Sequence, residues 1–202
     1  MQVHEKMKNE TAREYAFRTI KDNIISLELV PGSLVSENEL ANQMGISRTP
    51  VREALIELSK LKIVGIYPQK GSYISLLDGE MVDEARFLRL TLEGAIVQLA
   101  CKMATEEDII ALEENIRLQE FYLQSSSNEK LLELDNELHK LLFEICNKKV
   151  TYNLLGGIMI HFDRARSLSI AVLKDSKVYA DHKELVDAIK KRDGNEARNV
   201  IE

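Results

Sequence analysis

The fold of the N-terminal part is decided by residues 36–55, SENELANQMGISRTPVREAL. Ser36 followed three residues later by Glu39 is a capping-box pattern, which predicts the start of a short helix. Gly45 permits the tight turn that ends this helix, and Ser47 stands at the N-cap position of the helix that follows. Two helices joined by a glycine-containing turn are typical of a helix-turn-helix motif.

The helix that begins after Ser47 has a polar end and an apolar face. Arg48, Thr49 and Arg52 cluster in its first turns, where backbone N–H groups and the helix dipole also favour phosphate. Arginine can donate two hydrogen bonds to guanine, and threonine can contact a phosphate or a thymine methyl group. We therefore predict that Ser47, Arg48, Thr49 and Arg52 contact DNA. The inward-facing positions are Val51, Ala54, Leu55 and Leu58.

A short β segment follows this helix. Val64–Tyr67 and Ser72–Ile74 are strand-like and flank PQKG at residues 68–71, a pattern that predicts a β-hairpin wing. Lys70 and Gly71 lie at its tip, where a cation and a bare backbone can approach the minor groove or the phosphates. We predict that both residues contact DNA.

The rest of the chain is predicted to be helical. The last proline is Pro68, and apolar residues beyond it recur at the spacing of an α-helix. We expect a mainly α protein with a domain boundary at residues 76–77, where Asp78 can cap the next helix. A winged helix-turn-helix domain would span residues 1–76, and an all-α domain residues 77–202. The expected helices after the boundary span residues 79–103, 106–124, 128–146, 149–173, 176–192 and 195 to the end.

Composition excludes some classes of protein and leaves DNA binding open. The net charge is −6, but residues 1–76 hold 10 Lys and Arg against 9 Asp and Glu, whereas residues 77–202 hold 17 against 24. Phosphate binding depends on the basic and acidic residues near the binding surface and not on the net charge of the whole chain. No apolar run approaches the roughly 18 residues of a membrane span, and residues 1–15 lack the apolar core of a secretory signal. Cys101 and Cys146 are expected to be free buried thiols, so we predict a cytoplasmic protein.

Three ionisable residues fall on apolar helix faces in the second part. Asp135 and His139 lie one turn apart on the apolar side of their helix, and a buried carboxylate needs a partner. They could form an Asp–His hydrogen bond in the core, or they could be two ligands of one divalent metal. His182 shares a helix face with Leu185 and other apolar residues. A third ionisable side chain inside the same bundle favours a metal site over a simple Asp–His hydrogen bond.

The N-terminal part resembles the GntR family of transcription regulators over residues 11–76. The resemblance is carried by LVPGSLVSENELA at residues 29–41, GISRTPVREAL at residues 45–55 and PQKG at residues 68–71. Two positions depart from the family pattern. Asn38 stands where many relatives carry Arg, and Lys62 stands near the usual helix-ending Gly.

Residues 80–202 resemble the FCD ligand-binding domain of the FadR subfamily, through RLTLE at residues 89–93, Asp135-x-x-x-His139 and HKELVDAI from His182. The resemblance implies a six-helix bundle that holds Zn²⁺, Ni²⁺ or a similar ion with Asp and three His, beside a small organic acid. It assigns Asp135, His139 and His182 as metal ligands.

The family's last His would lie just past Glu202. Either the chain continues beyond that residue, or water or effector completes the site, because His161 fits the pattern poorly as a substitute. Arg89 matches an arginine that faces the effector carboxylate in relatives, but it could equally pair with Glu93.

The sequence therefore predicts a bacterial DNA-binding transcription regulator, and not an enzyme. We expect a homodimer, most simply a repressor, that binds two-fold-related operator DNA and responds to a small organic acid beside Zn, Ni, Mn or Fe. Three alternatives remain. The same regulator could bind an apolar or acyl-CoA ligand without metal, it could be a scaffold with no ligand, or Asp/His/His could belong to a metalloenzyme. The enzyme alternative leaves the DNA-binding part unexplained.

Overall fold

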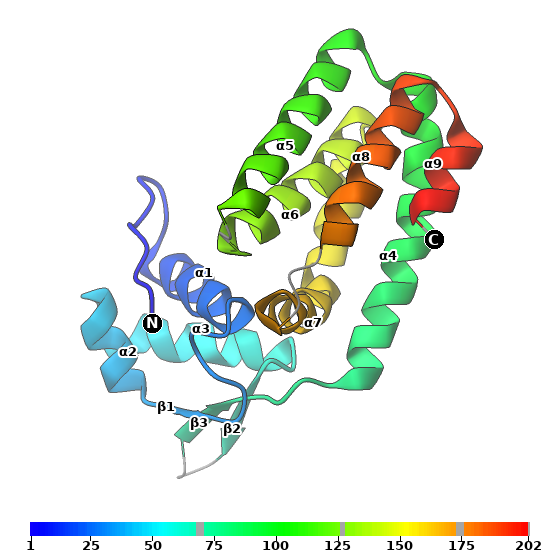
Figure 1. Cartoon of the computed structure of the whole chain (residues 1–202). Helices are drawn as coiled ribbons and strands as arrows, with labels where there is room; N and C mark the ends of the chain where they lie inside the picture. Colours follow the sequence, from blue (N-terminus) through cyan, green and yellow to red (C-terminus); the bar gives the residue numbers. More distant parts are fainter. Residues whose placement is uncertain (68–70, 126–127, 173–175, 202) are drawn as a thin grey trace. The chain divides into compact units, whose positions relative to one another are not determined.

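The computed structural model describes residues 1–67, 71–125, 128–172 and 176–201 (Figure 1). The chain forms two compact units, and each has its own apolar core. The first unit is Met1–Val82 with Ile160–Leu168, and the second is Asp83–Met159 with Ser169–Glu202. The domain boundary at residues 76–77 stays a prediction.

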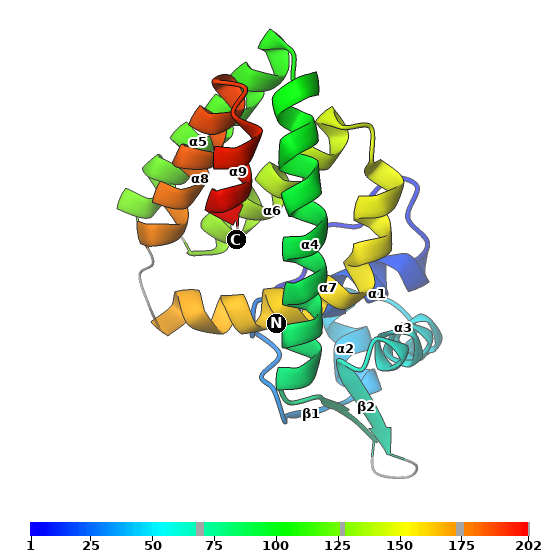
Figure 2. The same ribbon diagram turned by 90° about the vertical axis from the view of Figure 1, so that its right-hand side faces the viewer.

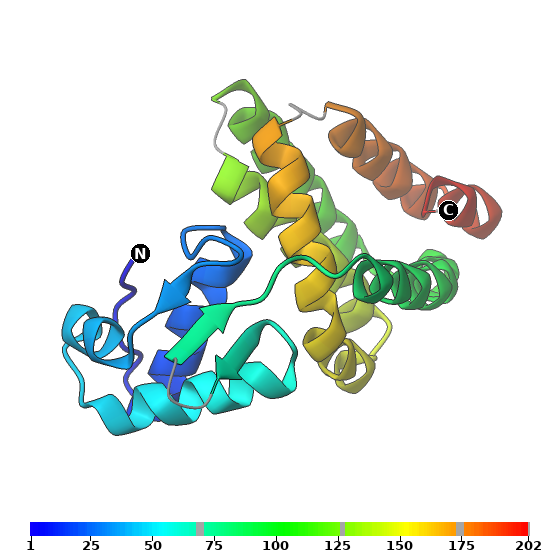
Figure 3. The same ribbon diagram turned by 90° about the horizontal axis from the view of Figure 1, so that it is seen from below.

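The first unit combines three helices with a small antiparallel sheet (Figures 1 and 3). The strand order is β1-β3-β2, with Leu34 opposite Tyr73 and Val64 opposite Ile74. The helix-turn-helix and the hairpin were predicted, but the strand β1 was not. Its elements are α1 (Ala12–Ile25), β1 (Leu34–Val35), α2 (Glu37–Met44), α3 (Arg48–Lys60), β2 (Val64–Tyr67) and β3 (Gly71–Ile74).

Local signals set the ends of α2 and α3. The Ser36 hydroxyl accepts a hydrogen bond from the N–H of Glu39 at 3.4 Å, so α2 begins where expected. Gly45 has a φ of 65°, and this left-handed conformation ends α2. Ser47 is the N-cap of α3, but its side chain makes no capping hydrogen bond. After α3, Lys62 has a φ of 60°, which is strained for a residue with a Cβ.

Helices α4 to α9 contribute to the second unit, although the first residues of α4 and Ile160–Leu168 of α7 group with the first unit. Within the described residues, the bounds of these helices were predicted to within about two residues at each end. Helix α5 packs against both α6 and α8, and α9 packs against α8 (Figures 1 and 2). The helices are α4 (Gly79–Met103), α5 (Glu106–Gln124), α6 (Asn128–Ile145), α7 (Lys149–Val172), α8 (Ser176–Lys190) and α9 (Gly194–Ile201).

The core of the second unit is formed mainly by α4, α5, α6 and α8. Leu112, Leu138, Leu142, Phe143 and Leu185 are fully buried there. The two cysteines are free and buried, as predicted. Within the described residues, no helix combines the length and the apolar character that crossing a membrane requires.

Candidate functional site

The N-terminal end of α3 presents the residues predicted to contact DNA. Ser47, Arg48, Thr49 and Arg52 are all exposed. The opposite face of α3 is buried in the core of the first unit, through Val51, Ala54, Leu55 and Leu58. The apolar face therefore anchors the helix, while its polar end and first backbone N–H groups remain open to a partner.

Arg48 has a partner on α2. Its Nε lies 2.5 Å from Oε2 of Glu37, and the side chains of Arg48 and Glu37 are 62% and 22% exposed. This pair was not predicted from the sequence, because the two residues are eleven positions apart and on different helices. An exposed pair of this kind contributes little stability, so a phosphate can compete for Arg48.

The hairpin β2–β3 forms the predicted wing. Gly71 is exposed and has a φ of 102°, a conformation that favours glycine. The rings of Tyr67 and Tyr73 stack with centroids 4.8 Å apart and join the two strands. Lys70, the other residue predicted at the wing tip, lies outside the described residues.

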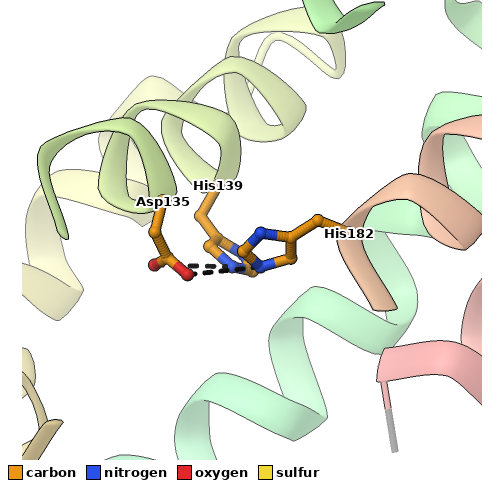
Figure 4. A group of neighbouring side chains, drawn as sticks. All are labelled: Asp135, His139 and His182. Atoms are coloured by element: carbon orange, nitrogen blue, oxygen red, sulfur yellow. Dashed lines mark ion pairs between the residues drawn. The ribbon is translucent and has the colours of Figure 1, made fainter. Parts of the chain in front are cut away.

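The second unit brings Asp135, His139 and His182 together. Asp135 and His139 lie on α6 and His182 lies on α8, and Figure 4 shows both imidazole rings directed at the carboxylate. One ligand atom from each residue lies within 4.8 Å of the other two. The three side chains are only 2%, 5% and 6% exposed.

Each imidazole turns its Nε2 atom toward Asp135. His182 Nε2 lies 3.2 Å from Oδ1 and His139 Nε2 lies 3.9 Å from Oδ2 of that carboxylate. On the far side of the rings, His182 Nδ1 lies 2.9 Å from Gln119 Oε1, and His139 Nδ1 lies 3.0 Å from Glu93 Oε2. Glu93 is a close contact of Nδ1, but neither ring nitrogen of His139 makes a hydrogen bond within the described part of the chain.

Arg89 and Glu93 of α4 place further charges next to this cluster. Arg89 Nε lies 3.1 Å from Glu93 Oε1, and Arg89 Nη2 lies 3.6 Å from Asp135 Oδ2. The pairing with Glu93 that the sequence left open is therefore present. A role for Arg89 toward an effector stays a prediction.

Burial and neighbouring charges set the ionisation of His139 and Glu93. Burial lowers the pKa of His139, and the positive charge of Arg89 lowers that pKa further, so its imidazole is neutral at pH 7. Burial tends to raise the pKa of the Glu93 carboxyl, but the pKa is held below its ordinary value, with the Arg89 guanidinium as the permanent positive charge beside it. A neutral imidazole is the form that ligates a metal.

The donor set fits a transition metal. One carboxylate oxygen and two imidazole nitrogens suit Zn²⁺, Ni²⁺, Mn²⁺ or Fe²⁺ better than Ca²⁺ or Mg²⁺, which prefer oxygen ligands. The buried His139 has two ring nitrogens without a hydrogen bond in the described chain, and a metal would satisfy one of them. His161 does not join the cluster, since its Nε2 lies 2.9 Å from the backbone oxygen of Leu61.

The residues that face Nδ1 of the two imidazoles were not predicted from the sequence. Glu93 was considered only as a partner of Arg89, and Gln119 and Asn115 were not considered at all. A signal was present, since Asn115 and Gln119 are four residues apart on the buried face of α5. Buried amides at helical spacing indicate a polar network, although the pattern does not tell which residue they contact.

Two family models match the chain. Residues 12–74 match the model described as bacterial regulatory proteins, gntR family, and residues 84–202 match the FCD domain. The chain is a GntR-family transcription regulator with an FCD domain.

This GntR-family regulator is similar to curated relatives along most of its length. It is 28% identical over 186 residues to the HTH-type transcriptional repressor RspR of Escherichia coli K12, covering 92% of the chain and 82% of the relative. It is 32% identical over 193 residues to an HTH-type transcriptional regulator from an unstable DNA locus of Streptomyces ambofaciens, covering 95% and 80%. The family and these relatives are transcription regulators and not enzymes, as predicted.

The fold of the GntR-family regulator is shared with solved structures. E. coli McbR/YncC matches with a TM-score of 0.82 at 19% identity, covering 94% of this chain and 91% of that one. A putative GntR regulator from Rhodococcus sp. RHA1 matches with a TM-score of 0.72 at 19% identity, covering 93% and 90%. At this identity the likeness is one of fold, and it confirms the predicted architecture.

Proposed function

We propose that this regulator is a repressor whose operator affinity is changed by a small organic acid bound beside a divalent transition metal. Family membership already makes the chain a DNA-binding transcription regulator. The observation that carries the sensing function is the buried group of Asp135, His139 and His182, whose ligand atoms lie within 4.8 Å of one another.

Operator contact is assigned to the polar end of α3 and to the wing. Arg48 and Arg52 would read base edges or phosphates in the major groove, while Ser47 and Thr49 would bind the backbone. Their exposure supports this assignment. Arg48 would exchange Glu37 for DNA, and Lys70 and Gly71 would approach the adjacent groove.

We further propose a homodimer of the FadR subfamily that works in the cytoplasm on chromosomal DNA. Two copies of α3 would enter successive major grooves, about 34 Å apart along a two-fold-related operator. The FCD units would supply much of the dimer contact and set the spacing of the two DNA-binding units.

The charge of the cluster supports an anionic effector. Arg89 carries one positive charge, and Glu93 and Asp135 carry one negative charge each, so these three residues sum to one negative charge when both carboxyls are ionised. A divalent cation would change that sum to one positive charge. Little solvent reaches the cluster, so this positive charge would need a negatively charged partner. A carboxylate of the effector would supply it.

Each residue has a defined task in this site. Asp135, His139 and His182 would hold the metal, which when bound supplies a positive charge for a carboxylate oxygen. Arg89 would orient the second oxygen with its planar guanidinium while keeping Glu93 ionised behind His139. The acid would alter operator affinity only to the extent that it binds one state of the dimer more tightly than the other.

A binding experiment tests the DNA assignment. Double-stranded DNA selected from a random library by the purified chain supplies the operator, and fluorescence anisotropy at fixed salt gives the affinity. Arg52→Ala should weaken binding by about 1–3 kcal/mol, and more for the selected sequence than for random DNA. Arg117→Ala removes the same charge from an exposed position on α5 and serves as the control. Equal operator affinity of Arg52→Ala and the wild type would reject the assignment.

A second experiment tests the sensor. Operator affinity of the zinc-loaded chain is measured against a panel of small mono-, di- and tricarboxylates. At least one acid should lower the affinity, and His139→Ala should lose both the metal and this response while still binding operator. Metal retained by His139→Ala would point to a different site. A response of the metal-free wild type to an acyl-CoA would favour the apolar alternative.

A further inference from the structure

We infer that Gln119 and Asn115 of α5 are positioning residues that fix the tautomer of His182, so that its Nε2 lone pair faces the metal position. This inference rests on the proposed metal site and names two residues that serve it. Asn115 and Gln119 are 4% and 3% exposed, and neither is a metal ligand. Buried amides must be hydrogen-bonded, and here the bonds form a chain that ends at His182.

The direction of this chain is set by its first member. Asn115 Nδ2 lies 3.0 Å from the backbone oxygen of Leu134 on α6. A carbonyl oxygen can only accept, so the amide nitrogen of Asn115 must point at it. The Asn115 oxygen is then left to accept a hydrogen bond from Gln119 Nε2 at 2.7 Å.

The orientation of the Gln119 amide fixes which nitrogen of His182 carries the proton. Because the Gln119 nitrogen is used toward Asn115, the Gln119 oxygen faces His182 Nδ1 at 2.9 Å. An amide oxygen can only accept, so Nδ1 must carry the proton. A neutral His182 therefore has its lone pair on Nε2, the atom 3.2 Å from Asp135 Oδ1. A lone pair next to a carboxylate oxygen is repelled unless a proton or a metal ion lies between the two, and as ligands of one metal both would face the same ion.

His139 has the same orientation through a different partner. Its Nδ1 faces Glu93 Oε2 at 3.0 Å and its Nε2 faces Asp135. Both imidazoles thus have a side-chain oxygen near Nδ1 and Asp135 near Nε2, and within the described chain the one hydrogen-bonded at Nδ1 is His182. The oxygen near Nδ1 belongs to a charged carboxylate for His139 and to a neutral amide for His182, and an amide adds no further negative charge to the buried cluster.

Two substitutions at one position separate positioning from simple packing. Gln119→Leu removes the acceptor for Nδ1, whereas Gln119→Glu keeps an acceptor there. Both remove the donor to Asn115, so a purely structural role would affect both variants alike. Gln124→Leu, at an exposed position of the same helix, is the control for the substitution itself.

Zinc affinity is the first measurement, by competition with a chromophoric chelator on the full chain. We expect Gln119→Leu to bind Zn²⁺ about 10- to 100-fold more weakly than the wild type. Gln119→Glu should recover most of that loss, and Gln124→Leu should match the wild type. Wild-type affinity in Gln119→Leu, or an equal loss in Gln119→Leu and Gln119→Glu, would overturn the inference.

The tautomer of His182 is the second measurement, by long-range ¹H–¹⁵N NMR on the metal-free chain. The wild type and Gln119→Glu should show the Nδ1–H tautomer, and Gln119→Leu should lose it. An unchanged tautomer in Gln119→Leu would overturn the inference even if zinc affinity fell. A wild type that binds no Zn²⁺ would reject the proposed metal site, while the tautomers of the variants would still decide whether the amide chain orients His182.

Discussion

Replacing Arg89 with leucine tests whether this arginine stabilises the buried charge cluster. Arg89 is 8% exposed, and its guanidinium lies 3.1 Å from Glu93 Oε1 and 3.6 Å from Asp135 Oδ2. Leucine keeps much of the apolar volume of the arginine stem but removes the charge. The Glu93 carboxylate then stays buried without its permanently charged partner.

The expected loss is large for a single substitution. Removing one partner of a buried ion pair costs about 3–5 kcal/mol, because the other charge stays buried without compensation. An exposed ion pair would contribute less than about 1 kcal/mol. Glu93 and Asp135 are only 5% and 2% exposed, so the larger value applies here. We therefore predict that Arg89→Leu lowers the free energy of unfolding of the metal-free chain by about 3–5 kcal/mol.

Urea unfolding followed by circular dichroism, with chelator present, measures this difference. Arg86→Leu is the matched control, since Arg86 is exposed on the same helix, and it should stay within about 0.5 kcal/mol of the wild type. The double variant Arg89→Leu/Glu93→Leu should recover most of the loss, because a buried pair replaced by apolar residues is close to neutral.

A small effect would refute this reasoning. If Arg89→Leu unfolds within 1 kcal/mol of the wild type, Arg89 is not needed to hold Glu93 and is free to serve the effector alone. If the double variant is no more stable than Arg89→Leu, the loss comes from packing and not from an uncompensated charge.

Three further outcomes are expected. Lys62→Gly should stabilise the chain by about 0.5–1 kcal/mol in urea unfolding, because Lys62 has a φ of 60°, and a destabilisation would contradict this. Thr105→Ala should cost about 1 kcal/mol by removing the capping box with Asp108 at the start of α5, and an unchanged unfolding midpoint would show that the box contributes nothing. Burial raises the pKa of the Cys146 thiol to about 11, so a disulfide reagent at pH 8 should modify Cys146 only after unfolding. Rapid labelling of the native chain would mean that Cys146 is accessible.

Periodicity in the sequence was sufficient to predict the helices. Long apolar repeats bounded by caps such as Thr105 and turns such as Gly45 have a local cause, so their positions were predicted closely. The strand β1 was missed because two residues, Leu34 and Val35, are too few to alternate, and the strand exists only through its pairing with β3.

The sequence singled out the three residues that cluster in the second unit, but not the residues that support them. Asp135 and His139 are one turn apart, so helical spacing alone placed them on one face. Nothing local links Glu93 or Gln119 to these residues, since they come from other helices and their role depends on how α4, α5 and α6 pack. The Glu37–Arg48 pair was missed for the same reason.

Elemental analysis of the purified chain tests the central claim, a metal-dependent sensor, most directly. The full chain is purified without chelator, dialysed against buffer, and measured beside Asp135→Ala. We expect about one Zn, Ni, Mn or Fe per chain in the wild type and none in the variant. No metal in the wild type, even after dialysis with each of these ions, would contradict the account, as would equal metal in both samples.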